Sequence, residues 1–202
     1  ILWMASGLFK NNAAEIIKEN NELFTVQTIL SIATEYQPLI KLKAATKSEA
    51  RVNIKAKTSG EVVRIGATQG KYVKKDTVLC SLGVVELNRT EVKAPFSGFI
   101  EQIVKPGNFL ERGQICATII QLNPIKFDAG VPEYDINKVR IGQKVDLELV
   151  TGQKIAGELT FVSKSASPDT RTFKVESQIE NLNGFIKDGL TANMTIKIDK
   201  VR

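Results

Sequence analysis

Short runs of Val, Ile, Leu and Thr, several of them alternating with polar residues, follow one another from Phe24 to Ile198. In residues 144–150, KVDLELV, the side chains of Val145, Leu147 and Leu149 point to one face of an extended strand and the charged residues between them to the other. Gly, Pro, Asn or Asp punctuate nearly every break, as turns do. The pattern predicts an all-β protein of barrels or sandwiches. Strands are expected at 24–36, 38–45, 50–57, 61–66, 77–82, 98–104, 114–120, 125–131, 143–150, 154–163, 172–179 and 193–198, and short helices only at 15–22 and 133–140.

One phrase is written twice in the first half of the chain, as IKAKTSGEVVRIGATQGKYVKKDTVLC (54–80) and VKAPFSGFIEQIVKPGNFLERGQIC (92–116). Each copy predicts a turn, a strand, a glycine turn and a second strand. Gly60 and its counterpart Gly98 are expected where the chain needs positive φ or a close backbone approach. Because two strands cannot bury an apolar face alone, the copies should face each other in one sandwich. The matches are Lys55-Ala56 with Lys93-Ala94, Ser59-Gly60 with Ser97-Gly98, Ile65 with Ile103, Gly70 with Gly107, Val73 with Leu110, and Val78-Leu79 with Ile115-Cys116.

The repeated phrase resembles the split lipoyl/biotinyl-type domain. In carrier proteins of that fold, a lysine at the tip between the halves takes the cofactor. The corresponding linker here, GVVELNRTE (83–91), contains no lysine. Its polar residues Glu86, Asn88 and Arg89 cannot form the amide with lipoate or biotin. No cofactor is therefore expected.

The downstream sequence resembles the periplasmic adaptor, or membrane fusion protein (HlyD-like family), of resistance–nodulation–division tripartite efflux pumps. Residues 124–149, with Glu133, resemble the opening of the adaptor β-barrel, and residues 157–181, with Asp169 to Thr172, resemble its later strands. The phrase at 188–198 resembles the closing one, with Asn193 where glycine is usual. Asparagine also tolerates the left-handed conformation, so the turn can survive.

This resemblance implies a non-enzymatic adaptor that links an inner-membrane efflux transporter to an outer-membrane channel for the export of small molecules. It also implies a homo-oligomer, trimeric or hexameric, that is anchored in the inner membrane and faces the periplasm. Two alternatives are an adaptor of an ABC or type I secretion exporter and a biotinyl or lipoyl carrier domain.

The resemblance also divides the chain. Adaptors of this family usually place a long α-helical hairpin between the lipoyl halves, but the linker 83–91 has only about nine residues, so the hairpin is absent or deleted. Trp3 and Lys10 fit the end of a membrane helix, although a short apolar strand or helix end is the alternative. The expected parts are the end of a membrane anchor (1–9), a linker (10–24), strands joining the β-barrel and a membrane-proximal region (25–53), a lipoyl-like domain (54–121, with halves 54–82 and 92–120), and the β-barrel domain (122–202).

The composition argues against most kinds of catalytic and metal-binding site. The chain has no histidine, so the commonest general base and the commonest neutral metal ligand are missing, and no catalytic, cofactor-binding or metal-binding residue is assigned. The net charge of +6 is spread along the chain and interrupted by acidic residues, as on solvated faces. No recognition-helix pattern or aromatic-basic platform is present, so no nucleic-acid partner is expected.

The two cysteines, Cys80 and Cys116, lie near equivalent places in the two copies, at the ends of apolar strands. They form no CxxC and no zinc spacing. We expect buried free thiols; a disulfide is the alternative if the compartment is oxidising.

Matching turns of the two copies, VKKD (73–76) and LERG (110–113), carry the candidate contacts between protomers. Lys74, Lys75 and Arg112 of one protomer could meet Glu111 or Asp76 of the next, or they could be exposed turn charges that contribute little. Two further expectations concern single residues. Arg171 should pair with Asp169 or another carboxylate to hold a loop, and Phe96 should pack inside the lipoyl-like half.

Overall fold

The computed structural model describes residues 26–30, 35–83 and 90–199. The chain divides into two compact units, Ile1–Thr34 and Glu35–Arg202, and all the strands assigned lie in the second. In the first unit, the described residues 26–30 form no strand, and Val26, Ile29 and Leu30 are exposed. The strand expected at 24–36 is therefore wrong for those residues, whose apolar positions do not alternate. The anchor expected at 1–9 and the helix expected at 15–22 lie outside the described residues.

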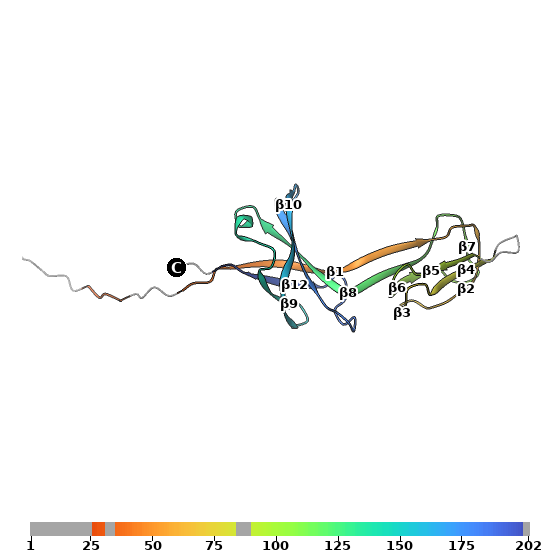
Figure 1. The fold of residues 1–202 in the computed structure, drawn as a ribbon, viewed down its shortest axis with the longest axis horizontal. Helices are drawn as coiled ribbons and strands as arrows, with labels where there is room; N and C mark the ends of the chain where they lie inside the picture. The colour runs from red at the N-terminus through yellow and green to blue at the C-terminus, as the bar shows by residue number, and fades with distance from the viewer. Residues whose placement is uncertain (1–25, 31–34, 84–89, 200–202) are drawn as a thin grey trace, which may run out of the picture. The chain divides into compact units, whose positions relative to one another are not determined.

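The second unit is all-β, as predicted (Figure 1). The expected helix at 133–140 is reduced to one 3₁₀ turn, η1 (Ile136–Lys138). The short strands β3, β5 and β7 were not expected, because two to four residues are too few to show a pattern. The strands are β1 (Leu39–Lys55), β2 (Gly60–Ile65), β3 (Tyr72–Val73), β4 (Val78–Gly83), β5 (Thr90–Lys93), β6 (Gly98–Ile103), β7 (Phe109–Leu110), β8 (Ile115–Pro132), β9 (Lys144–Leu149), β10 (Lys154–Ser167), β11 (Thr172–Ile179) and β12 (Thr191–Lys197).

Strands β1 and β8 each combine two predicted strands into one long strand. They pair antiparallel with each other from Ala44 opposite Ala129 to Lys55 opposite Ile115. The register shifts between Ser48 and Ala50, as it does at a β-bulge, so the pairing continues past an irregular point. One two-stranded ribbon therefore supplies strands to two separate hydrophobic cores (Figure 1).

The first core lies in a sandwich built by the repeated phrase. One sheet has the order β5-β4-β2-β7, and the other, through the β1–β8 pairing, has the order β1-β8-β6-β3. When the two copies are matched, strands β5, β4, β2 and β7 of the first sheet correspond in turn to β1, β8, β6 and β3 of the second. The buried side chains between them include Val62, Leu79 and Leu82 from one sheet and Ile100 and Ile119 from the other.

Backbone hydrogen bonds between the copies repeat this equivalence. The Ala56 amide donates to the Gln114 carbonyl (2.8 Å), and the Ala94 amide donates to the Thr77 carbonyl (2.9 Å). In return, the amides of Gly113 and Asp76 donate to the carbonyls of Ala56 and Ala94 (2.9 and 2.8 Å). Each copy therefore uses the other to satisfy its backbone, and the prediction that the copies face each other in one sandwich is confirmed.

The close approach expected at Gly60 and Gly98 is confirmed. A Cβ at Gly60 would lie 2.4 Å from the Gly83 carbonyl oxygen, and one at Gly98 would lie 2.4 Å from the Ile120 carbonyl oxygen. Neither glycine has positive φ. That requirement falls on the later turn glycines Gly70 and Gly107, at φ 81° and 87°.

The second core lies in a barrel of strands β1, β12, β9, β10, β11 and β8, which the β1–β8 pairing closes. Its fully buried side chains include Phe127, Ile125, Leu147, Leu159 and Met194. The alternation predicted in residues 144–150 is confirmed, because β9 alternates strictly between exposed and buried positions.

Candidate functional site

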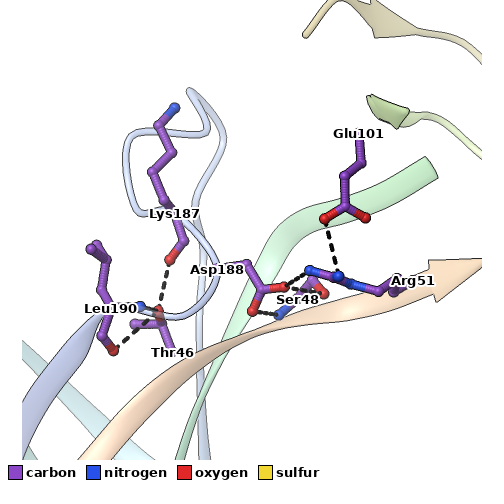
Figure 2. A network of polar contacts seen from close by, with 7 residues as sticks. All are labelled: Thr46, Ser48, Arg51, Glu101, Lys187, Asp188 and Leu190. Atoms are coloured by element: carbon purple, nitrogen blue, oxygen red, sulfur yellow. Dashed lines mark hydrogen bonds and ion pairs between the residues drawn. The ribbon is translucent and has the colours of Figure 1, made fainter. Parts of the chain in front are cut away.

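The described residues contain no group of three or more His, Cys, Asp or Glu side chains that could hold a metal ion. The most developed polar arrangement, drawn in Figure 2, is structural. It lies where the β1–β8 ribbon passes from the barrel to the sandwich. We call it the junction network and define it by Thr46, Ser48, Arg51, Glu101 and Asp188. It connects β1 to β6 of the sandwich and to the loop that precedes β12 of the barrel.

Arg51 is the centre of the network. Its Nη2 lies 2.8 Å from Asp188 Oδ2, and its Nη1 lies 3.0 Å from Glu101 Oε1. The Arg51 side chain is 52% exposed, whereas that of Asp188 is 18% exposed. One guanidinium therefore binds a carboxylate of the barrel loop and a carboxylate of the sandwich at the same time, as its fork of donors allows.

Ser48 completes the environment of Asp188. The Ser48 backbone amide donates to Asp188 Oδ1 and its hydroxyl donates to Oδ2, both at 3.2 Å. Partial burial raises the pKa of Asp188, but the hydrogen bonds from Arg51 and Ser48 outweigh it, so the pKa lies below its ordinary value. The hydrogen bond to Asp188 holds the pKa of Arg51 above its ordinary value, against the opposing effect of burial. The pair is therefore charged across the physiological range.

The loop that carries Asp188 is held by β1 at its C-terminal end. Thr46 is buried, and its hydroxyl donates to the Lys187 carbonyl (2.7 Å) and accepts from the Leu190 amide (2.8 Å). The backbone adds bonds from the Thr46 amide to the Leu190 carbonyl and from the Gly189 amide to the Thr46 carbonyl. Figure 2 shows the contacts of Thr46 with Lys187 and Leu190 beside the Arg51 contacts, on the same strand.

At its other end, the same loop is held by β8 through Asn181, which is 6% exposed. The Asn181 side-chain amide donates to the carbonyls of Leu122 (2.9 Å) and Ile186 (2.8 Å). Its carbonyl oxygen accepts from the Ile186 amide, and its backbone amide donates to Asn123 Oδ1 (2.9 Å). The loop 180–190 is thus a fixed element of the junction, although Leu182 and Phe185 on it are 78% and 77% exposed.

An aromatic side chain of the sandwich packs across the junction as well. Phe99 of β6 packs against the barrel core, and its ring meets Tyr72 edge-on with centroids 5.2 Å apart. A Cβ at Gly184 would come within 2.9 Å of the Phe99 ring, so only glycine fits there, at φ 61°. A hollow of about 300 Å³ lies beside this contact, and Phe96 lines it while packing against the sandwich core. The packing expected for Phe96 is confirmed.

The structure places the predicted protomer contacts on two equivalent exposed turns. The Lys75 amide donates to Ser97 Oγ (2.9 Å), and the Arg112 amide donates to Ser59 Oγ (3.1 Å), again in matching positions. Within residues 35–83 and 90–199, the charged groups of Lys74, Lys75, Asp76, Glu111 and Arg112 form no ion pair. They are therefore available for contacts with other molecules.

Arg171 does not form the expected ion pair with Asp169 or with another carboxylate of the described residues. Its side chain is exposed, and its backbone has φ 50°. The Arg171 amide donates to the Ser167 carbonyl (2.8 Å) and so closes the turn between β10 and β11. The role of this position is a backbone role, which the phrase DTRT alone does not reveal.

Cys80 and Cys116 are joined in a disulfide. The expected burial is confirmed, at 0% and 1% exposure, but the expectation of free thiols is wrong. The reason is geometric. Cys80 lies on β4 and Cys116 on β8, in the two facing sheets, and their Cα atoms are 6.5 Å apart, within disulfide range.

Sequence reasoning missed the junction network. Its partners Arg51 and Asp188 are 137 residues apart in the chain, and each looks like an ordinary surface charge in its own segment. No helix long and apolar enough to cross a membrane is found among the described residues.

Comparison with known proteins shows what the chain is similar to. The sequence profile of the CusB-like β-barrel domain matches residues 127–200. The nodulation protein NolF of Rhizobium meliloti (strain 1021) is 30% identical over 116 residues, which are 56% of this chain and 32% of NolF. The membrane fusion protein MtrC of Neisseria gonorrhoeae is 27% identical over an alignment of 174 residues, which covers 77% of this chain and 40% of MtrC. Over these stretches the chain is similar to NolF and to a membrane fusion protein.

A solved structure supports the same fold. MacA from Actinobacillus actinomycetemcomitans superposes with a TM-score of 0.71 at 13% identity, covering 85% of this chain and 83% of that of MacA. The chain spans about a third of NolF and two fifths of MtrC. The resemblance to membrane fusion proteins read from the sequence is confirmed.

Proposed function

We propose that this chain is the periplasmic adaptor of a resistance–nodulation–division efflux system. In that role it links an inner-membrane transporter to an outer-membrane channel for the export of small molecules. The observation that carries the proposal is the succession of a two-copy sandwich and a CusB-like barrel on one continuous β1–β8 ribbon. A carrier function has no support, because the linker 83–91 has no lysine to modify.

The proposed mechanism is mechanical. The barrel docks on the inner-membrane transporter, and sandwiches of neighbouring protomers pack side by side in a ring of three or six. The junction network sets how the sandwich is held relative to the barrel within each protomer. Because a membrane anchor confines the adaptor near its partner, weak docking contacts suffice.

The proposal keeps the division expected from the sequence. Residues 1–9 end a membrane anchor, 10–24 are a linker, and 25–53 join the barrel to a membrane-proximal region. Residues 54–121 are the lipoyl-like domain and 122–202 the β-barrel domain. Their hydrophobic side chains separate into the two cores in a way that supports a boundary near residue 121. The protein is then anchored in the inner membrane and faces the periplasm.

The ring contacts are proposed at the two exposed turns. Lys74, Lys75 and Arg112 of one protomer would meet Glu111 or Asp76 of the next. The double variant Lys74→Glu/Arg112→Glu should weaken assembly, measured by sedimentation and by cross-linking in membranes. The matched control is Lys164→Glu, an exposed change on the barrel strand β10. Equal assembly of both variants would remove these turns from the interface.

The function is tested by affinity purification of the tagged full-length protein from membranes of its native cell, with mass spectrometry of the eluate. A proton-driven inner-membrane transporter in the eluate supports the proposal, and an outer-membrane channel beside it supports the complete assembly. An ATP-binding transporter instead would assign the chain to an ABC or type I exporter. A soluble protein with an added cofactor mass would overturn the adaptor proposal.

A further inference from the structure

The disulfide between Cys80 and Cys116 has a place in the fold that goes beyond crosslinking two strands. It joins β4 of the first copy to β8 of the second, across the core of the sandwich. Both cysteines belong to that core and are 0% and 1% exposed. In the closed sandwich, neither sulfur can be reached by another protein.

The sandwich core is small enough to need this bond. Its buried members are aliphatic side chains, three alanines and the two cysteines, with no aromatic side chain fully buried. The barrel core has fully buried Phe127 and a larger set of buried side chains without any disulfide. Domains of about 70 residues have little stability to spare, and small ones commonly rely on disulfides.

The way the sandwich is assembled strengthens this dependence. Each copy satisfies its backbone through the other, as the bonds between Ala56 and Gln114 and between Ala94 and Thr77 show. With the thiols reduced, all these contacts must form at once to bring the copies together. The disulfide closes a loop between residues 36 apart in the chain and so restricts the open state.

We propose that this chain is the substrate of a thiol–disulfide oxidase and that oxidation of Cys80 and Cys116 must precede closing of the sandwich. The oxidant is a protein disulfide. One cysteine thiolate attacks it to form a mixed disulfide and releases one thiol of the oxidase. The second cysteine thiolate then attacks the mixed disulfide, forms the Cys80–Cys116 bond and releases the second thiol. Two protons are lost from the cysteines, and the two electrons reduce the oxidase to a dithiol.

The order of events follows from access. The attacking species is a thiolate, which apolar burial disfavours, and the attack needs the oxidase to touch the sulfur. Both conditions are met in the open chain and neither in the closed sandwich. This step does not depend on what the mature protein binds, so its test is independent of the proposed function.

The first test follows thiol accessibility during refolding. The full-length protein, reduced and unfolded in urea, is diluted without oxidant and treated with a maleimide, and the mass is measured. We expect both thiols to be labelled, and we expect protection only after addition of a catalytic amount of a thioredoxin-fold oxidase with oxidised glutathione. Thiols that become protected from the maleimide without any oxidant would show that the sandwich closes before oxidation and would overturn the proposal.

The second test uses the native protein and needs no variant. Dithiothreitol should reduce the native disulfide only through opening, so labelling should be slower than in urea. Equal rates with and without urea would show that the bond is accessible in the closed state and would contradict the proposal.

A variant then distinguishes the contribution of the disulfide from that of side-chain packing in the core. In the Cys80→Ala/Cys116→Ala variant, the sandwich should be cleaved by protease while the barrel stays resistant. Loss of a disulfide that closes a loop of this length shifts the equilibrium between the closed and the open sandwich toward the open state by roughly 500-fold. The control Val62→Ala removes buried methyl groups from the same core and keeps the disulfide. A double cysteine variant as protease-resistant as Val62→Ala would overturn the dependence on the bond.

Discussion

The sandwich and the barrel share the β1–β8 ribbon but are held together by different means. The sandwich has a small aliphatic core, reciprocal backbone bonds between two copies and a buried disulfide. The barrel has a closed ring of strands and a core built around Phe127, Met194 and long aliphatic side chains. A domain that fills its interior with large side chains gains more from burial, so we expect the barrel to be stable without a crosslink and the sandwich to depend on one.

The same contrast applies to how each region is defined in the sequence. The sandwich is assembled from two copies close together in the chain, so the equivalence of its two halves can be seen in about 60 residues of sequence. The barrel brings together strands from the two ends of the second unit, β1 and β12, which pair from Leu39 opposite Lys197 to Ala45 opposite Thr191. The junction network lies where the sandwich and the barrel meet, and Arg51 contacts both of them.

The largest expected effect tests the barrel core. Phe127→Ala removes a fully buried ring and should lower the free energy of unfolding of the barrel by about 3–5 kcal/mol, as core phenylalanines do. Urea unfolding followed by far-UV circular dichroism measures it. Phe161→Ala is the control, because Phe161 is 44% exposed and its removal should cost far less. Similar losses in the two variants would contradict the assignment of the core.

The next effect tests the equivalence of the sandwich halves. Gly60→Ala and Gly98→Ala should each destabilise the sandwich by about 2 kcal/mol or more, since each new Cβ would lie 2.4 Å from a backbone oxygen. Limited proteolysis of the oxidised protein measures the opening. Gly107→Asn is the control: nothing lies within 4 Å of a Cβ there, and asparagine tolerates its φ of 87°. Unequal losses at Gly60 and Gly98 would break the equivalence.

A smaller effect tests the junction. Arg51→Met leaves the partly buried Asp188 without its cation and should cost about 1–2 kcal/mol, because a charge-assisted bond inside a network is worth more than an exposed pair. The distribution of distances between spin labels on β2 and β10 should broaden as well. In the control Lys93→Met, an exposed pair with Glu91 is lost, and the expected cost is about 0.5 kcal/mol or less. Equal losses of stability in the two variants would show that the junction network does not hold the sandwich to the barrel.

Much of this fold is predictable from local pattern, because alternation and repetition are local. The buried face of β9, the facing copies and the tight glycines Gly60 and Gly98 all follow from short stretches. The continuous strands β1 and β8 do not, because a β-bulge allows pairing to pass through polar residues such as Ser48 that look like a break.

The parts of the site that could not be predicted depend on distant contacts. Arg51 meets Asp188 only because β1 and the loop before β12 are adjacent in the closed barrel. The bond between Cys80 and Cys116 depends on how the two sheets face each other, which the sequence spacing leaves open. Arg171 was expected to act through its charge, and its positive φ became visible only in the turn.

The smallest expected effect is the pH dependence of the junction. The pKa of Asp188 in the folded protein lies below its ordinary value of 3.8, so the pair stabilises the protein fully above that value and loses its contribution as the pH falls through the folded pKa. The Asp188→Asn variant should therefore be less stable than the parent at about pH 6, by about 1 kcal/mol or less for such a partly exposed pair, and the difference should shrink at about pH 2. Urea unfolding at both values measures it. A difference that stays constant with pH would assign the role of Asp188 to the shape of its hydrogen bonds with Ser48 and not to its charge, and the loop before β12 would then be held without electrostatic help from Arg51.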